Sequence, residues 1–161
     1  RVLQCFERTE LSVMVDEQRR KLLHFAVVGG GPTGIELAAE LHDLIHDNLA
    51  RTYPGLMPFV GITVYDAPKI LPMFDKKLSS YTIDTFRLQG IHVKTKHHLQ
   101  SIRPDVDGKG GLKIKIQEYD DYEVGASMLV WLSKNSKAAY LIEKHTFLNY
   151  TKRGKLFYLM P

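Results

Sequence analysis

A buried strand that runs into a glycine-rich turn and then into a helix constrains this chain more than any other feature. Phe25 to Val28 form a continuous apolar run, which is typical of a strand covered on both faces of a parallel sheet. Gly29, Gly31 and Gly34 follow in the spacing G-x-G-x-x-G, and a helical pattern starts directly after them. This order predicts an α/β fold with a central parallel sheet.

Each glycine of the turn has a physical reason in a dinucleotide-binding fold. Gly29 permits the tight turn, Gly31 lets a pyrophosphate approach the backbone, and Gly34 lets the helix lie close to its strand. The N–H groups and the positive end of the helix dipole then face the ligand. The residues predicted to bind a diphosphate are Gly29, Gly30, Gly31, Pro32, Thr33 and Gly34.

Two alternatives to the dinucleotide interpretation are a glycine turn that binds nothing and a methyltransferase-type loop. Pro32 is tolerated in a first helical turn. With proline and threonine before the third glycine, and with a helix that starts at once, the sequence favours the dinucleotide form.

A second strand is predicted over Val60–Asp66, and it ends in a carboxylate. An acid at this position of a dinucleotide fold accepts hydrogen bonds from the adenosine ribose and repels a 2′-phosphate. Asp66 stands 32 residues after Gly34, more than the roughly 20 that are usual. A long helix over Ile35–Leu49 and a loop at Tyr53–Pro58 account for the extra length. We predict that Asp66 binds the ribose, and a plain capping acid is the alternative.

The rest of the chain supplies further elements around this centre. The predicted elements are helices within 1–21, a helix over Asp75–Gly90, a strand over Ile91–Lys94, a hairpin of Leu99–Pro104 and Leu112–Glu118 around the turn Asp107–Gly111, and a buried strand over Ser127–Trp131. From Leu132 onward the pattern dissolves, so we expect an irregular tail; a basic aromatic tail that lies on a membrane surface is the alternative. The predicted organisation is a helical connector at 1–21, a Rossmann-like domain with an added β-hairpin layer at 22–132, and a divergent tail at 133–161.

Composition and charge exclude several functional classes. The 161 residues, 44% of them hydrophobic, suffice for one well-cored domain, and the net charge of +4 comes from lysines and arginines scattered among acids. We therefore expect no nucleic-acid partner.

The single cysteine, Cys5, has no disulfide or C-x-x-C partner, so we expect a packing role. No apolar run reaches the roughly 18 residues of a membrane helix. The chain begins without Met or a cleavable leader, so we expect a piece of a longer protein.

Histidines occur in two arrangements that could attract a metal. His42 and His46 are spaced i, i+4 on the predicted helix, which is a chelating spacing, but no third ligand is evident. We therefore expect solvent-facing histidines and no metal site. His97 and His98 are adjacent on an extended segment, where successive side chains point to opposite faces and cannot share a ligand.

The run Leu22–Glu36, continued by Glu40–Leu44 and Met73–Asp75, resembles the NADH-binding domain of type II, rotenone-insensitive NADH:ubiquinone oxidoreductases. These belong to the pyridine nucleotide-disulfide oxidoreductase superfamily, and the fungal external form is the most similar, over about Arg1 to Trp131. The resemblance implies a flavoenzyme on the intermembrane-space side of the mitochondrial inner membrane. It moves a hydride from NADH to FAD and then electrons to ubiquinone, without pumping protons. Its NADH fold is inserted within an FAD fold, and only the NADH fold is visible here.

The resemblance also implies roles for individual residues. The glycine turn holds the NADH pyrophosphate, Glu36 lies toward the nicotinamide ribose, and Asp66 holds the adenosine ribose. None of these residues is catalytic, because the flavin accepts the hydride in the other fold.

The chain departs from the family after Trp131. The family has a small residue, Thr and Gly in a turn close to the cofactors, whereas this chain has Leu132-Ser133-Lys134, and lysine fits a glycine-type turn poorly. The second flavin-domain segment, the quinone-facing residues and the C-terminal membrane helices have no counterpart. We expect a truncated or aberrant product that binds NADH but lacks an FAD site. A stand-alone NAD(H) sensor and a product without function are the alternatives.

Overall fold

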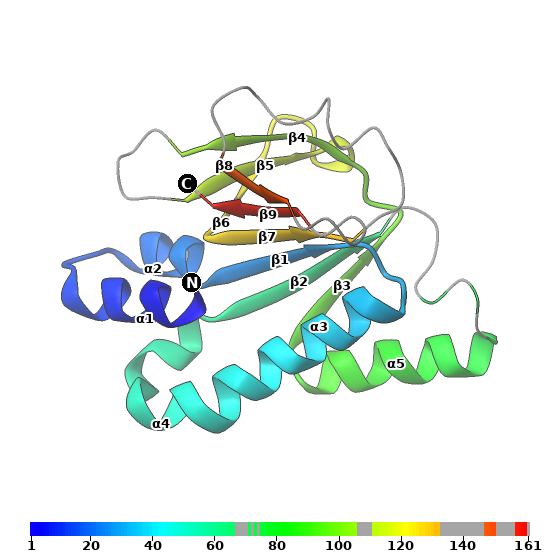
Figure 1. Ribbon diagram of the computed structural model, residues 1–161, viewed down its shortest axis with the longest axis horizontal. Coiled ribbons are helices and arrows are strands. Elements are labelled where there is room, and N and C mark those ends of the chain that lie inside the picture. The colour runs from blue at the N-terminus through cyan, green and yellow to red at the C-terminus, as the bar shows by residue number, and fades with distance from the viewer. Residues whose placement is uncertain are drawn as a thin grey trace.

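A six-stranded sheet forms the centre of the molecule, with the strand order β3-β2-β1-β7-β9-β8 (Figure 1). The computed structural model describes residues 1–66, 71, 73, 75–105 and 111–132 and the backbone of 147–150 and 157–160. Four strands run parallel, namely β1 (His24–Val28), β2 (Gly61–Asp66), β3 (Ile91–Thr95) and β7 (Met128–Trp131). The predicted α/β fold with a central parallel sheet is confirmed.

Strand β1 is covered on both faces because its residues alternate between two hydrophobic clusters. Phe25 and Val27 pack with helix residues on one face, and Ala26 and Val28 pack with residues of a second sheet on the other. All four side chains are buried. The continuous apolar run in the sequence therefore reflects a strand that lies between two layers.

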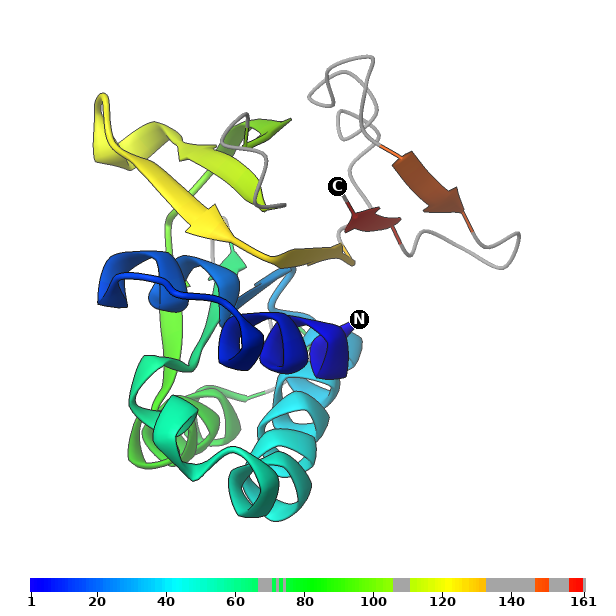
Figure 2. The same cartoon turned by 90° about the vertical axis from the view of Figure 1, so that its left-hand side faces the viewer.

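Helices cover one face of the central sheet (Figures 1 and 2). They are α3 (Pro32–Asp43), the π-helical η1 (Leu44–Leu49), α4 (Ala50–Thr52), the 3-10 helix η2 (Pro54–Phe59) and α5 (Lys76–Leu88). Asp75 caps α5, since its Oδ1 accepts a hydrogen bond from the N–H of Leu78 at 2.7 Å, and Gly90 ends the segment with a φ of +76°. Within the described residues, no helix is both long enough and apolar enough to cross a membrane.

A three-stranded antiparallel sheet covers the other face (Figure 2). Its strands are β4 (Leu99–Pro104), β5 (Leu112–Ile116) and β6 (Glu123–Ala126), with the short 3-10 helix η3 (Gln117–Tyr119) between β5 and β6. The sequence predicted a two-stranded hairpin and missed β6, whose four residues are too few to show an alternating pattern. Most of the turn expected at Asp107–Gly111 lies outside the described residues.

The N-terminal helices α1 (Val2–Leu11) and α2 (Asp16–Leu22) precede β1. Cys5 and Phe6 of α1 belong to the same buried cluster as Phe25 and Val27. The packing role expected for Cys5 is confirmed. The division of the chain at 21/22 and at 132/133 stays a prediction.

The irregular tail predicted from residue 133 is wrong for two short segments. β8 (Phe147–Tyr150) and β9 (Phe157–Met160) extend the central sheet as antiparallel strands. β9 pairs with β7, so that Leu129 lies opposite Leu159 and Trp131 opposite Phe157. The sequence missed them because each has four residues, and their pairing depends on the distant edge of β7.

Candidate nucleotide-binding site

The glycine turn lies at the carboxyl edge of the parallel sheet, between β1 and α3 (Figure 1). The N–H of Gly29 donates to the carbonyl of Tyr65 at 2.8 Å, and the carbonyl of Gly30 accepts from the N–H of Leu71 at 2.7 Å. These bonds hold the turn against the end of β2 and against Leu71. Gly29 has a φ of +122°, which side-chain-bearing residues rarely adopt, so the backbone requires glycine there.

Gly34 and Gly31 differ in what surrounds them. A Cβ at Gly34 would lie 1.9 Å from the carbonyl oxygen of Gly29, so the close approach of α3 to the turn requires glycine, as predicted. A Cβ at Gly31 would meet no described atom within 4 Å, and its φ of −73° suits any residue. Nothing in the described fold requires glycine at position 31. The approach of a pyrophosphate to its backbone stays a prediction.

The first turn of α3 is open toward this space. The carbonyl of Gly31 accepts from the N–H groups of Gly34 at 3.0 Å and Ile35 at 3.1 Å. In the described part of the chain, no side chain caps this helix end, and Pro32 and Thr33 are exposed. The positive end of the helix is therefore available to an anion.

Asp66 ends β2 at the same edge of the sheet. It directly follows Tyr65, whose carbonyl holds Gly29, and its own carbonyl accepts from the N–H of His97 at 3.1 Å. In the sheet register it lies opposite Thr95 of β3. The structure thus places the glycine turn and Asp66 at the same edge of the sheet. Their roles in holding a diphosphate and a ribose stay predictions.

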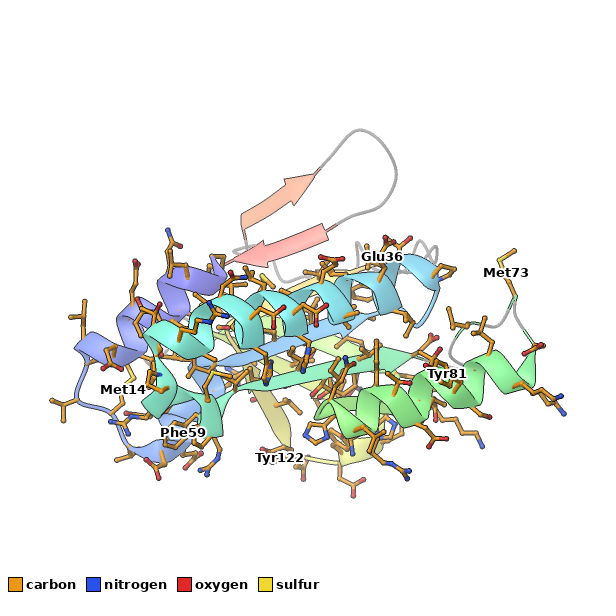
Figure 3. The ribbon with its side chains drawn as sticks, turned by 90° about the horizontal axis from the view of Figure 1, so that it is seen from below. Met14, Glu36, Phe59, Met73, Tyr81 and Tyr122 are labelled. Atoms are coloured by element: carbon orange, nitrogen blue, oxygen red, sulfur yellow. The ribbon has the colours of Figure 1, made fainter. Side chains whose placement is uncertain are left out.

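Glu36 lies near the start of α3 and points outward from the helix (Figure 3). Its side chain is exposed. Its orientation toward a nicotinamide ribose stays a prediction.

Strand β7 flanks β1 on the side opposite β2, so the chain reverses its strand order at the glycine turn. Ligands of open α/β sheets bind at such a switch point. The N–H of Leu132 donates to the carbonyl of Val28 at 2.7 Å, so the chain leaves β7 beside the turn.

Trp131 is 5% exposed and packs in the core as predicted. Ser133 and Lys134, where the chain departs from the family pattern, lie outside the described residues.

Sequence reasoning missed one residue of this site, Leu71. It is buried, it has a φ of +48°, and its N–H holds the carbonyl of Gly30. No sequence signal could have revealed it, because leucine is not a residue that favours positive φ.

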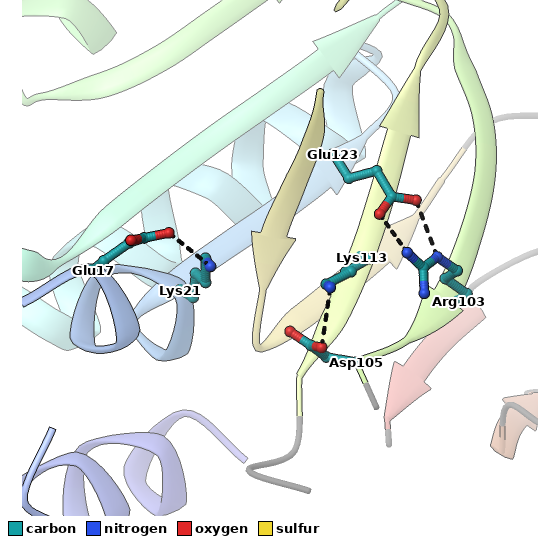
Figure 4. A network of polar contacts seen from close by, with 6 residues as sticks. All are labelled: Glu17, Lys21, Arg103, Asp105, Lys113 and Glu123. Carbon is teal, nitrogen blue, oxygen red and sulfur yellow. Dashed lines mark hydrogen bonds and ion pairs between the residues drawn. The ribbon is translucent and has the colours of Figure 1, made fainter. Parts of the chain in front are cut away.

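A polar network lies around the second sheet and α2 (Figure 4). Arg103 donates to both carboxylate oxygens of Glu123, at 3.0 and 2.6 Å, and these bonds hold the pKa of Glu123 below its ordinary value. Lys21 pairs with Glu17 at 2.8 Å, and Lys113 pairs with Asp105 at 3.4 Å.

A cavity of about 170 Å³ lies between α2 and this second sheet, lined by residues that include Leu22, Asp105 and Gly125. None of its lining residues belongs to the glycine turn. Because α2 precedes β1 and the glycine turn follows it, the cavity lies toward the other end of the strand. The cavity is therefore separate from the candidate nucleotide site.

Residues 5–155 match the pyridine nucleotide-disulphide oxidoreductase family. The chain is 43% identical over 105 residues to the mitochondrial external alternative NAD(P)H-ubiquinone oxidoreductase B4 of Arabidopsis thaliana, a match that covers 65% of this chain and 18% of the relative. It is 40% identical over 106 residues to the mitochondrial external alternative NADH-ubiquinone oxidoreductase of Yarrowia lipolytica, and this match covers 65% of this chain and 18% of that relative.

Among solved structures, NDH2 from Plasmodium falciparum in complex with NADH superposes with a TM-score of 0.69 at 30% identity, covering 82% of this chain and 26% of that one. The chain thus spans about a quarter or less of the length of these relatives. The resemblance to alternative NADH:ubiquinone oxidoreductases, seen first in the glycine-turn run, is confirmed and includes plant as well as fungal relatives. The chain belongs to the pyridine nucleotide-disulphide oxidoreductase family.

Proposed function

We propose that this chain is the NADH-binding part of a flavin-dependent NADH:ubiquinone oxidoreductase that does not pump protons. The observation that carries the proposal is Gly31, a glycine in the G-x-G-x-x-G turn at which the described fold leaves open space. The relatives support it, since the plant and fungal proteins are named ubiquinone oxidoreductases and the Plasmodium structure contains NADH.

The residues present fit a dinucleotide. The turn from Gly29 to Gly34 and the uncapped start of α3 would hold the pyrophosphate, and Asp66 would accept hydrogen bonds from the adenosine ribose. Glu36 would lie toward the nicotinamide ribose. Bound NADH supplies a hydride, and the role of these residues is to bind and orient it. FAD would be held by another domain, because the sequence has one G-x-G-x-x-G turn.

The proposal also includes the cellular location of the whole protein. The plant and fungal relatives are named mitochondrial. We place the whole protein on the intermembrane-space side of the mitochondrial inner membrane, with ubiquinone as the electron acceptor.

Nucleotide binding is tested with the fluorescence of Trp131, the single tryptophan of the chain. Trp131 lies opposite Val28, the residue before the glycine turn, so reduced nicotinamide bound nearby should quench its emission by energy transfer. We expect saturable quenching by NADH, with calorimetry as an independent measurement. A titration without saturation in both measurements would overturn NADH binding.

The enzymatic role is tested in a chimera. Residues 22–132 replace the corresponding segment of the Yarrowia lipolytica relative, and NADH-dependent ubiquinone reduction is measured. We expect a flavin-containing chimera that oxidises NADH, and Gly31→Val in the chimera should abolish this. A chimera that holds flavin and binds NADH without oxidising it would contradict the enzymatic role and favour an NAD(H) sensor.

A further inference from the structure

An open hollow of about 530 Å³ lies beside Tyr65, on the face of the central sheet that packs with the second sheet. His24 of β1 and Thr63 of β2 line it from the central sheet, and Tyr119 and Tyr122 line it from the connection between β5 and β6. None of its described lining residues belongs to the glycine turn. Its volume lies in the range of about 300–1,000 Å³ that is usual for small-molecule sites.

Tyrosine rings form the apolar part of the hollow. Tyr65 is buried in β2, whereas Tyr122 is 66% exposed and lies at the surface (Figure 3). The rings of Tyr119 and Tyr122 have centroids 6.4 Å apart and planes inclined by 58°, so the two rings do not stack on each other. The ring of His97 holds Tyr119 in a T-shaped contact at 5.1 Å. The hollow therefore has aromatic surface that is partly fixed and still accessible.

Two of the tyrosines carry phenols that stay neutral at pH 7. Burial raises the pKa of Tyr65, and the nearby phenols of Tyr119 and Tyr122 raise it further, while a hydrogen bond with Thr63 opposes the rise. Burial also raises the pKa of Tyr119. Their hydroxyl oxygens can accept hydrogen bonds from a ligand without adding charge to the hollow.

Asp120 gives the hollow a negative charge. Among the described residues that line it, Asp120 is the only acid, and no lysine or arginine occurs. His24 lines it as well, but its Nδ1 donates to the carbonyl of Gly125 at 2.7 Å and its Nε2 lies 2.9 Å from Oγ1 of Thr63. Burial lowers the pKa of His24 below its ordinary value of 6.5, so above pH 7 the neutral ring predominates. A cation that enters the hollow meets a carboxylate and no opposing cationic side chain among these residues.

The turn that carries Asp120 is one that normally favours glycine. Asp120 has a φ of +48° and a ψ of −115°, and the N–H of Tyr122 donates to the carbonyl of Tyr119 at 2.9 Å. These are the features of a type II′ turn, in which the first central residue is usually glycine. Within the described part of the chain, no hydrogen bond or ion pair engages the Asp120 carboxylate. The chain thus holds an unpaired acid in a strained conformation at the hollow, which is a common property of ligand sites.

We propose that this hollow binds a small organic amine in its protonated form. The ammonium group pairs with the carboxylate of Asp120, and the apolar part of the amine lies on the rings of Tyr119 and Tyr122. The site is separate from the proposed ribose contact. Successive side chains of a strand point to opposite faces, so the side chains of Tyr65 and Asp66 point away from each other.

The test titrates 2-phenylethylamine into the full chain at pH 7.5 and follows the ring resonances of labelled tyrosine by nuclear magnetic resonance. We expect saturable shifts at Tyr119 and Tyr122. The control ligand is 2-phenylethanol, which has a hydroxyl in place of the ammonium group and should bind at least about fivefold more weakly. Equal affinities for the amine and the alcohol would show a nonspecific apolar surface and overturn the proposal.

A matched pair of variants tests the carboxylate. Asp120→Asn removes the charge but keeps the turn, because asparagine also tolerates a positive φ. It should weaken binding of 2-phenylethylamine by about fivefold or more. Asp121→Asn removes the next acid in the chain, which is not among the lining residues, and should leave the affinity unchanged. Equal affinities of the two variants would show that Asp120 does not hold the ammonium group.

Two further measurements separate this site from its surroundings. Tyr122→Leu keeps an apolar side chain at an exposed position and should weaken amine binding by about two- to fivefold, with urea unfolding unchanged. NADH should not displace the amine, because the hollow lies apart from the glycine turn. Displacement by NADH would assign the hollow to the nucleotide site, and a separate amine site would be wrong.

Discussion

At the scale of single residues, the turn contains two glycines that the chain needs for different reasons. Gly31→Val should abolish NADH binding while changing the free energy of unfolding by no more than about 0.5 kcal/mol, because a side chain there meets open space in the protein. Gly34→Val should destabilise the fold by about 1–3 kcal/mol or more, because its Cβ would overlap the carbonyl of Gly29. Urea unfolding and NADH titration measure the two effects separately.

The pair of variants separates a ligand role from a packing role. If Gly31→Val bound NADH as well as the parent chain, the turn would be only a structural corner, and the proposed function would fail with it. A Gly34→Val variant of parental stability would contradict the close packing of α3 on the turn.

Asp66 should set the preference for NADH over NADPH. Its carboxylate would accept charge-assisted hydrogen bonds from the ribose, worth about 1.5–3 kcal/mol, and it would repel a 2′-phosphate. Because about 1.4 kcal/mol corresponds to a factor of ten in affinity, Asp66→Ala should weaken NADH binding about tenfold or more and reduce the discrimination against NADPH. Fluorescence titration with both nucleotides gives the ratio.

A matched control for this variant is Asp84→Ala on α5. Asp84 is an acid that pairs with Arg87 on the same helix, and its removal should leave both affinities unchanged. Equal affinities of the parent chain for NADH and NADPH would remove Asp66 from the proposed site.

At the scale of elements, the sequence predicted those whose signals are local. β1 followed from an apolar run next to three glycines, and α5 from Asp75 at its start and Gly90 near its end. Strand β6 was missed because four residues are too few to show an alternating pattern, although it pairs with the neighbouring β5. The two strands beyond β7 were missed because they join the sheet through the pairing of β9 with the distant β7. The candidate site shows the same limit of prediction from sequence. The glycine turn and Asp66 could be predicted because they belong to a sequence motif. Leu71 could not, because it contacts the turn through its backbone N–H, which any residue type except proline provides.

His24, at the start of β1, should make stability depend on pH. Its Nδ1 lies 2.7 Å from the carbonyl of Gly125 and its Nε2 lies 2.9 Å from Oγ1 of Thr63. Burial lowers the pKa of His24 below its ordinary value of 6.5; the carbonyl contact opposes this shift, and the nearby His92 adds to it. The lowered pKa favours the neutral ring of His24 in the folded state.

The sign follows from proton linkage. Below pH 6.5 the unfolded chain binds a proton at His24 that the folded chain takes up only at lower pH, so the stability present above pH 6.5 declines as the pH falls toward the folded pKa. The slope from this one group is at most about 1.4 kcal/mol per pH unit. Urea unfolding between pH 7.5 and 5 should show the decline for the parent chain and a smaller one for His24→Gln. An equal decline in both proteins would exclude His24 as its source.

At the scale of the whole molecule, one sheet holds the chain together. The helices bury one face of it and the second sheet buries the other. The glycine turn follows the end of β1, a strand that contributes residues to both clusters. A chain organised in this way should present the turn in its binding geometry without help from a flavin domain.

The chain expressed alone should therefore bind NADH but remain colourless and inactive. Hydride transfer needs a flavin positioned against the nicotinamide, and a flavin needs its own nucleotide-binding fold, whereas this sequence has one G-x-G-x-x-G turn. The measurements are the visible absorption spectrum of the purified chain and its NADH oxidation with and without a soluble quinone, each after incubation with added FAD. Flavin absorbance that persists through gel filtration, together with steady NADH oxidation, would show that this chain holds both cofactors, and the assignment of a single nucleotide fold would be wrong.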